Sequence, residues 1–371
     1  MKSWAIIIGI NEYHPRAGQR VLHGAVADAA DFADWALHPD GGAVDPSCLY
    51  FWTHPAPTNP TQRVVDYLAA PTPWYDLESE AVIPDFSRVP YFNHIIETAL
   101  RAGRAAMDSG NDETRRIYVF FAGHGVQTNT YGSTTEIQTC FLLGDFRPDS
   151  VAVSGLIPCD DFRRALLTGG FDEVFMFLDC CRVAMTKLNL PAPSIGSPNS
   201  RDPPEPQWSV GHAAQKNKIA YETTDAPLRG AFSKTLLEGL RTVRDPASQK
   251  LTIESLKVYV RDKIGSYITY EQRPHFPYEP GDPPPVVLIG PPIPMPQTMA
   301  DIHITFGALP AGTIVHLCDD KGQRVGDPIA AAPAGVTVQA IAGQFYSLDV
   351  PGTTMSTAFR HSGPGVTNVN L

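Results

Sequence analysis

Two short motifs carry the reactive side chains of this sequence. The segment 173–179, EVFMFLD, is apolar until its last residues and is followed at once by Cys180 and Cys181. The segment 117–125, IYVFFAGHG, is apolar until His124, which stands between two glycines. A thiol becomes a useful nucleophile when a base takes its proton, and histidine is the usual base because its pKa lies near neutrality. The two motifs together predict nucleophilic thiol chemistry.

The two adjacent cysteines are expected to differ in role. Side chains on a strand alternate between faces, so extended backbone places Asp179 and Cys181 on one face and Cys180 on the other. Cys180 then packs inward as a small apolar residue. We therefore predict Cys181 as the nucleophile and His124 as its base. The backbone N–H groups of Gly125 and Cys181 are the predicted donors to the oxyanion of an acyl-transfer intermediate.

Both motifs follow segments with the pattern of buried strands. Apolar runs at 4–10, 117–125 and 173–179 alternate with helical patterns, which indicates an α/β unit with a mainly parallel sheet. Ligands bind such sheets beyond the carboxyl ends of the strands, where both motifs end. Helical patterns are found at 22–37, 94–107, 159–169, 230–241 and 252–264, and a fourth strand is predicted at 217–223.

Proline-rich stretches suggest how the chain is divided. The stretches 53–91 and 184–207 lie inside the α/β unit, residues 1–280, and are interpreted as long surface loops. Residues 281–297 are interpreted as an interdomain linker, although VVLI within them reads equally as one last strand. Beyond it, residues 298–371 alternate short apolar runs with glycine and proline turns, which predicts a small all-β domain, a sandwich.

Composition narrows the classes of function. The 371 residues carry a formal net charge of −10, and an acidic chain is a poor candidate for sequence-independent nucleic-acid binding. Such a chain more readily attracts basic peptides. The sequence contains neither a secretory signal core nor an apolar run long enough to span a membrane. The six cysteines form neither a disulfide framework nor a zinc motif, so we expect free thiols, a cytoplasmic location, no metal and no cofactor.

At this point the sequence resembles a known superfamily. FFAGHG and FLDCCR together resemble the caspase and metacaspase cysteine peptidases. The caspase signature is Q-A-C-[RQG]-G, with its histidine about 50 residues upstream; here glutamine and alanine are replaced by Asp179 and Cys180, and the glycine by Val183. The metacaspase pattern D-x-C fits better, although its following H-S-G is absent. WAIIIGINEY, LHGAVADA and GAFSKTLLEGL resemble further family segments, so the resemblance covers about residues 1–290.

The resemblance implies a caspase-like fold and a thiol peptidase with a His–Cys dyad, here His124 and Cys181. It also places Asp28 and Asp179 on the positions that line the first specificity pocket. An acidic pocket binds a guanidinium through charge-assisted hydrogen bonds, so the expected cleavage is after arginine, with lysine second. Glu222 and Asp225 lie where the family places further pocket residues. The expected partners are therefore proteins or peptides with Arg or Lys at the cleavage site, and neither nucleic acid nor membrane.

The resemblance further implies a mode of activation. Family members are often switched on by cleavage in the loop after the nucleophile, which is 184–207 here and offers Lys187 and Arg201 as basic sites. Bacterial members often act in cell-death or phage-defence cascades, some with an upstream activating protease.

Other interpretations remain open from the sequence alone. Cys180 and Cys181 can be buried structural thiols, Asp179 a helix cap or ion-pair partner, and Asp28 a solvated helix position. The chain can also be an inactive caspase-like scaffold that binds a partner through its β domain, since the glycine after the signature cysteine is missing. A third alternative is a thiol hydrolase or transferase that acts on a non-peptide acyl group.

Overall fold

The chain forms two compact units, Met1–Pro294 and Met295–Leu371. The division falls within the proline-rich stretch 281–297. The computed structural model describes residues 1–70, 90–109, 113–129, 137–148, 155–184, 192, 195, 206–278, 284–294, 299–307, 309–341, 345–361 and 366–371.

A five-stranded sheet forms the centre of the first unit. Its order is β2-β1-β3-β7-β9, and all of its strand pairs are parallel. The three inner strands are buried almost throughout, as their apolar sequences predict. The strands are β1 (Lys2–Ile10), β2 (Leu49–His54), β3 (Arg115–Ala122), β7 (Glu173–Asp179) and β9 (Gln207–His212).

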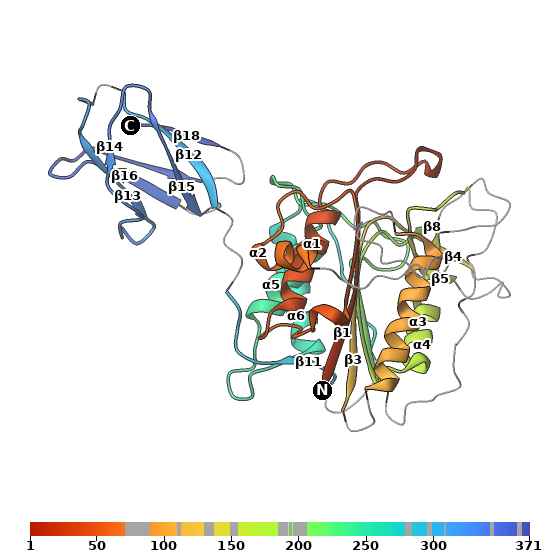
Figure 1. The fold of residues 1–371 in the computed structure, drawn as a ribbon. Helices are drawn as coiled ribbons and strands as arrows, with labels where there is room; N and C mark the ends of the chain where they lie inside the picture. The colour runs from red at the N-terminus through yellow and green to blue at the C-terminus, as the bar shows by residue number, and fades with distance from the viewer. Residues whose placement is uncertain are drawn as a thin grey trace. The chain divides into compact units, whose positions relative to one another are not determined.

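Helices cover both faces of this sheet (Figure 1). The helices α1, α2, α5 and α6 lie on one face, and α3 and α4 lie on the other. Burial of both faces explains why the inner strands are apolar throughout rather than alternating. Their bounds are α1 (Ala25–Leu37), α2 (Gln62–Ala69), α3 (Phe92–Asp108), α4 (Cys159–Gly169), α5 (Ala231–Thr242) and α6 (Ile253–Lys263), with short 3₁₀ turns at Pro15–Ala17, Pro46–Cys48 and Ile264–Ser266.

A smaller sheet continues from the carboxyl ends of β3 and β7. Its order is β6-β5-β4-β8, with β4 and β8 parallel and the other pairs antiparallel. The chain passes from β3 to β4 through Gly123 and His124, and from β7 to β8 through residues 180–182. The strands are β4 (Gly125–Asn129), β5 (Ile137–Leu142), β6 (Leu156–Pro158) and β8 (Val183–Ala184).

Two predictions about this unit are wrong. Residues 217–223 are not a strand, and the fifth strand is β9, whose sequence QWSVGH lacks a continuous apolar run. The stretch 53–91 is not simply a loop, because α2 lies within it and buries Val64 and Tyr67. Residues 71–89 of that stretch lie outside the described residues. The segment VVLI does form a strand, β11 (Val286–Ile289), which pairs antiparallel with β10 (Lys250–Thr252).

The second unit is a small two-sheet β structure, as predicted. Its sheets have the orders β15-β12-β18 and β14-β13-β16-β17. Ile302 and Ile304 of one sheet share a core with Leu317 and Leu348 of the other. Over the described parts of the chain, no helix has the length and apolar character needed to cross a membrane. The strands are β12 (Met299–Thr305), β13 (Ile314–Asp319), β14 (Ile329–Ala330), β15 (Val336–Ile341), β16 (Phe345–Asp349), β17 (Ser356–Arg360) and β18 (Thr367–Asn370).

Candidate active site

His124 and Cys181 occupy matching positions on neighbouring chain segments. In the large sheet Ala122 pairs with Asp179, and in the small sheet Val126 pairs with Val183. Both pairs have the same offset, because 179 − 122 = 57 and 183 − 126 = 57. His124 and Cys181 have this offset too and lie between the two pairs. Neighbouring strands are about 4.8 Å apart, so the two backbones pass close to each other at these residues.

Gly125 permits this close approach. A Cβ atom at Gly125 would lie 2.5 Å from Cys180 Sγ and 2.7 Å from the carbonyl oxygen of Cys181. A side chain at this position would therefore push the segment after β3 away from the segment after β7.

The two ring nitrogens of His124 differ in hydrogen bonding within the described part of the chain. Its Nε2 is 2.8 Å from the carbonyl oxygen of Arg20. A carbonyl only accepts hydrogen bonds, so Nε2 carries the proton and Nδ1 holds the lone pair. Among the described residues Nδ1 has no hydrogen-bond partner. Burial lowers the pKa of His124, which keeps the imidazole neutral near pH 7 and able to accept a proton.

Tyr13 supports the backbone of His124. The amide N–H of His124 donates to the Tyr13 hydroxyl at 2.9 Å, and that hydroxyl donates to the Leu142 carbonyl at 3.2 Å. The two rings also pack with their centroids 5.2 Å apart. The histidine is thus fixed both by its ring nitrogen and by its main chain.

Cys181 differs from the other five cysteines in its exposure. It is partly exposed, whereas the other five, Cys180 included, are buried. Its thiol donates to the carbonyl oxygen of Ala220 at 3.8 Å. Burial raises the pKa of Cys181, so the group is a thiol rather than a thiolate at neutral pH. Such a thiol needs a base to become a nucleophile.

Two backbone N–H groups, those of Cys181 and Gly125, have no hydrogen bond to any described residue. Within the described part of the chain, the N–H of Cys181 makes no hydrogen bond. The Leu142 N–H donates to the His124 carbonyl at 2.9 Å. This bond makes Gly125 and Phe141 a non-hydrogen-bonded pair, so the Gly125 N–H points away from β5. Both donors have the form that an oxyanion site requires.

Three of the four predicted pocket acids, together with Asp31, form a group of carboxylates that we call the acidic cluster: Asp28, Asp31, Asp179 and Glu222. Asp28 lies in α1 and is fully buried. It accepts hydrogen bonds from Arg229 Nε at 2.6 Å and from the Gly230 N–H at 2.7 Å. Asp31, one turn later, accepts from a terminal nitrogen of Arg229 at 2.7 Å. Two acids of one helix therefore hold a guanidinium of the same chain.

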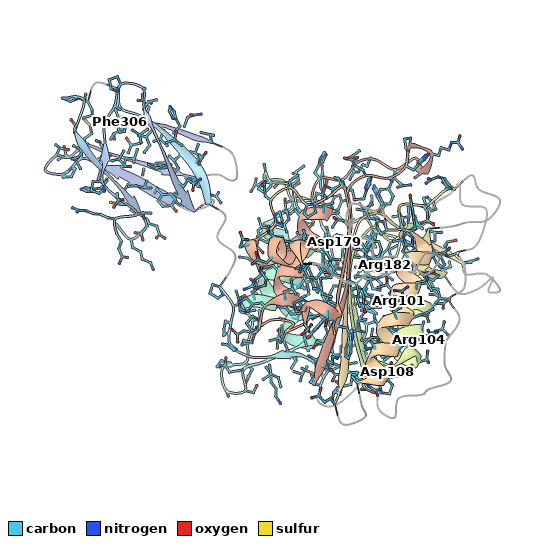
Figure 2. All side chains as sticks on the ribbon, in the orientation of Figure 1. Arg101, Arg104, Asp108, Asp179, Arg182 and Phe306 are labelled. Atoms are coloured by element: carbon cyan, nitrogen blue, oxygen red, sulfur yellow. The ribbon has the colours of Figure 1, made fainter. Side chains whose placement is uncertain are left out.

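Asp179 caps a helix. It is the last residue of β7 (Figure 2), and its carboxylate accepts from the N–H of Ser233 at 2.9 Å and from its hydroxyl at 2.6 Å. Ser233 is in the first turn of α5, whose N-cap residue, Gly230, offers no side chain. A carboxylate there satisfies an unpaired N–H group and complements the helix dipole.

Asp28 and Asp179 approach each other across the backbone of Gly230. A Cβ atom at Gly230 would collide with the Asp179 carboxylate and lie 3.0 Å from Asp28 Oδ2. Burial raises the pKa of Asp28 to about 7 and that of Asp179 to about 6, even though Arg229 lowers both. The pair therefore gains and loses protons in the pH range in which enzymes usually work.

The other two predicted pocket residues behave differently from each other. Glu222 accepts hydrogen bonds from the N–H groups of His23 at 2.7 Å and Gly24 at 2.8 Å, just before α1 begins. Its charge also raises the pKa of Asp179. The side chain of Asp225 is exposed, and among the described residues its one hydrogen bond is that of its backbone carbonyl with the Thr223 hydroxyl at 3.2 Å. The structure brings Asp28, Asp179 and Glu222 together and leaves Asp225 at the surface.

Comparisons with known proteins show the family of the chain. A family model of the caspase domain of peptidase family C14 matches residues 77–279. The chain belongs to the caspase-domain peptidases. The family model is that of a peptidase family. The matched range contains His124 and Cys181, but Asp28 lies outside it.

Two relatives support the assignment to different extents. A protein of a Desulfuromonadales bacterium, named a probable protease, is 28% identical in an alignment of 251 residues that covers 65% of this chain. This chain spans only 26% of the length of that relative. A crystal structure of a protein from Geobacter sulfurreducens matches with a TM-score of 0.45 and 16% identity, over 79% of this chain and 98% of that one. That likeness is too low to carry an argument.

Arg182, which follows Cys181 in this caspase-domain chain, is buried in the structure (Figure 2). Its guanidinium donates to the Thr139 hydroxyl at 2.8 Å and to the Ala214 carbonyl at 3.1 Å, and it lies 3.3 Å from His275 Nδ1. These contacts fix the chain after Cys181. Val183, which stands where the caspase signature has glycine, is part of β8.

Sequence reasoning missed three groups at this caspase-type site. The carbonyl of Arg20 orients His124, but a backbone carbonyl has no sequence signal. Tyr13 lies three residues after β1, within the family-like segment WAIIIGINEY, and its position there was the one available clue. Arg229 directly precedes the helical pattern at 230–241, and nothing in its surroundings indicates which acids it meets.

Proposed function

We propose that this protein is a cysteine endopeptidase that cleaves after arginine and, less efficiently, after lysine. Cys181 is the nucleophile and His124 is the base. The observation that carries the proposal is the matched position of these two residues at the ends of neighbouring strands, with an acid, Asp179, at the end of one of those strands. The family membership supports the reaction class, and the acidic cluster supports the preference for a basic residue.

The first half of the reaction forms a thioester. The Cys181 thiol leaves its contact with the Ala220 carbonyl, and its sulfur attacks the carbonyl carbon of the peptide while Nδ1 of His124 takes the thiol proton. The resulting oxyanion accepts hydrogen bonds from the N–H groups of Cys181 and Gly125. One such donor typically stabilises a transition state by about 3–4 kcal/mol. The C–N bond then breaks, and the imidazolium gives its proton to the leaving amine.

The second half of the reaction releases the acid. A water molecule gives a proton to Nδ1 of His124 and attacks the thioester carbonyl. The C–S bond breaks, the sulfur recovers its proton from the imidazolium, and a carboxylic acid leaves. In both halves the Arg20 carbonyl accepts the Nε2–H, so it stabilises the imidazolium and keeps Nδ1 directed to the reaction.

Charge favours a basic residue before the cut. The acidic cluster has four carboxylates and, in the structure, one bound guanidinium, that of Arg229. The remaining negative charge attracts a cation, and paired carboxylates suit the planar, forked guanidinium better than an ammonium. This reasoning places arginine ahead of lysine.

The test is a set of peptides that differ only in the residue before the cut: Arg, Lys, Ala or Asp. We expect the wild type to turn over the arginyl peptide fastest and Cys181→Ala to be inactive. Cys180→Ala is the matched control, since it removes a neighbouring buried thiol, and it should retain most activity. Undiminished turnover by Cys181→Ala rejects the nucleophile, and faster cleavage after Ala or Asp rejects the specificity.

We also propose activation by cleavage within 184–207 and a role in a bacterial cell-death or phage-defence cascade. The candidate sites Lys187 and Arg201 lie outside the described residues. The placement of this stretch directly after the nucleophile supports the proposal. Intact-mass analysis of the purified wild type, Cys181→Ala and a Lys187→Gln/Arg201→Gln double variant tests it. Full activity of an uncleaved double variant would exclude activation at these two residues.

A further inference from the structure

The acidic cluster already holds an arginine side chain. Arg229 uses Nε for Asp28 and one terminal nitrogen for Asp31, at 2.6 and 2.7 Å. The second terminal nitrogen has no bond to any described residue. The Arg229 side chain as a whole is 17% exposed, although that of Asp28 is fully buried. A guanidinium thus occupies the carboxylates that the proposed function assigns to the arginine of a substrate.

The backbone places Arg229 on the same loop as a contact of the nucleophile. The Thr223 N–H donates to the Arg229 carbonyl at 2.7 Å, and the Ala231 N–H donates to the Tyr221 carbonyl at 3.0 Å. Residues 221–231 therefore form a closed hairpin. Ala220 lies just before this hairpin, and its carbonyl accepts the hydrogen bond of the Cys181 thiol. A movement of this hairpin would alter the acidic cluster and the surroundings of the thiol together.

A second ion pair already links helix α5 to helix α1, so this link does not depend on Arg229. Arg241 of α5 is 2.7 Å from Asp34 of α1, and its side chain is only 2% exposed. This pair already ties the same two helices together, deep in the protein. Arg229 makes its bonds from a loop, and its Asp31 partner is 34% exposed. Solvent can therefore reach one side of the Arg229 pair, and a competing cation can too.

We propose that Arg229 is an internal competitor for the acidic cluster, and that a substrate must displace its side chain to place a basic residue beside Asp28. This inference rests on the proposed function. It makes Arg229 a specificity-determining residue, because the cluster accepts only those cations that compete with a tethered guanidinium. A guanidinium competes better than an ammonium, so Arg229 widens the preference for arginine over lysine.

The experiment compares Arg229→Ala and Arg229→Gln with Arg241→Ala, the matched control on the neighbouring ion pair. For both Arg229 variants we expect kcat/KM on the arginyl peptide to rise about tenfold or more, mainly through KM, which corresponds to losing one competitor of modest affinity. Turnover of an alanyl peptide should change by a much smaller factor, so the ratio of arginyl to alanyl turnover should rise. Arg241→Ala should leave the ratio of arginyl to alanyl turnover at the wild-type value.

A direct binding measurement uses agmatine, a small guanidinium compound. We expect it to inhibit Arg229→Gln at concentrations about tenfold lower than the wild type and to raise the melting temperature of that variant. Asp31→Asn provides a second route if the Arg229 variants do not fold, because Asp31 is half-exposed and pairs with Arg229. Weaker holding of Arg229 should then raise arginyl turnover about threefold or more.

The outcomes separate the two proposals. If the wild type cleaves after arginine but folded Arg229 variants or Asp31→Asn show equal or lower arginyl turnover, Arg229 does not compete and this inference fails alone. If Cys181-dependent cleavage occurs only after other residues in the wild type and the variants, the proposed specificity fails. A wild type that prefers the arginyl peptide, together with a further gain of arginyl cleavage in the Arg229 variants, supports both proposals.

Discussion

The pair of His124 and Cys181 and the acidic cluster are adjacent, yet they differ in how far their polar groups are hydrogen-bonded. At the dyad, Nδ1 of His124 has no partner among the described residues, and the Cys181 thiol has one long contact of 3.8 Å. In the acidic cluster every carboxylate has hydrogen bonds, such as those of Asp28 at 2.6 and 2.7 Å. The dyad thus has an imidazole nitrogen that can still accept a proton, whereas the carboxylates of the acidic cluster are already hydrogen-bonded within the protein.

This difference follows from burial. A fully buried carboxylate is costly unless it is paired, so Asp28 and Asp179 persist only because Arg229, Gly230 and Ser233 bond them. His124 and Cys181 are partly exposed, so atoms of these groups can remain free at little cost. The family resemblance predicted a His–Cys dyad and a set of pocket acids. The structure shows that at least one of these acids, Asp179, stabilises the start of a helix.

The largest expected effect separates chemistry from stability. His124→Ala removes the proposed base and, among the described residues, one ring hydrogen bond, the exposed one to the Arg20 carbonyl. We expect turnover to fall about 10³-fold or more, within the upper range for general-base catalysis, while the melting temperature stays near that of the wild type. Peptide hydrolysis and thermal unfolding of the same samples check this. A large loss of stability would mean that the imidazole is mainly structural.

Asp179→Ala should show the opposite balance. It leaves the Ser233 N–H and hydroxyl at the start of α5 without their acceptor, and we expect the free energy of unfolding to fall by about 1–3 kcal/mol. Urea unfolding measures this change. Asp225→Ala is the matched control, since its carboxylate is exposed and its loss should change stability by less than about 0.5 kcal/mol. Equal effects of the two substitutions would contradict the capping role.

The pH dependence should differ between substrates. The raised pKa values of Asp28, about 7, and Asp179, about 6, mean that these acids take up protons as the pH falls through 7 to 6. Because the neutral acids no longer attract a cation, kcat/KM for an arginyl peptide should fall about tenfold per pH unit below pH 6. An alanyl peptide should keep its rate to lower pH, since burial lowers the pKa of His124. Identical acid limbs would remove the acids from substrate binding.

The smallest effect concerns the support of the histidine. Tyr13→Phe removes the acceptor of the His124 N–H and the donor to the Leu142 carbonyl. We expect kcat to fall about three- to tenfold, the equivalent of about one hydrogen bond, with KM unchanged. Steady-state kinetics separates the two constants. A change confined to KM would place Tyr13 in substrate binding instead of positioning the base.

Much of the fold and the dyad could be predicted because they depend on local patterns. Continuous apolar runs identified β1, β3 and β7, since strands covered on both faces need no polar side. The short strands of the small sheet and β9 escaped, because strands of two to six residues with mixed polarity have no distinctive period. The helix α2 was not predicted, because the prolines around it led to the interpretation of the whole stretch as a loop.

The sequence by itself determined the α/β character of the first unit, the β character of the second, and a histidine and a cysteine at strand ends. Only the tertiary structure decided which groups serve them. Arg229 meets Asp28 across 201 residues of chain, and the Arg20 carbonyl meets His124 across 104. The physical reason is that charge partners depend on how distant elements pack, while a backbone carbonyl is chemically the same at every residue.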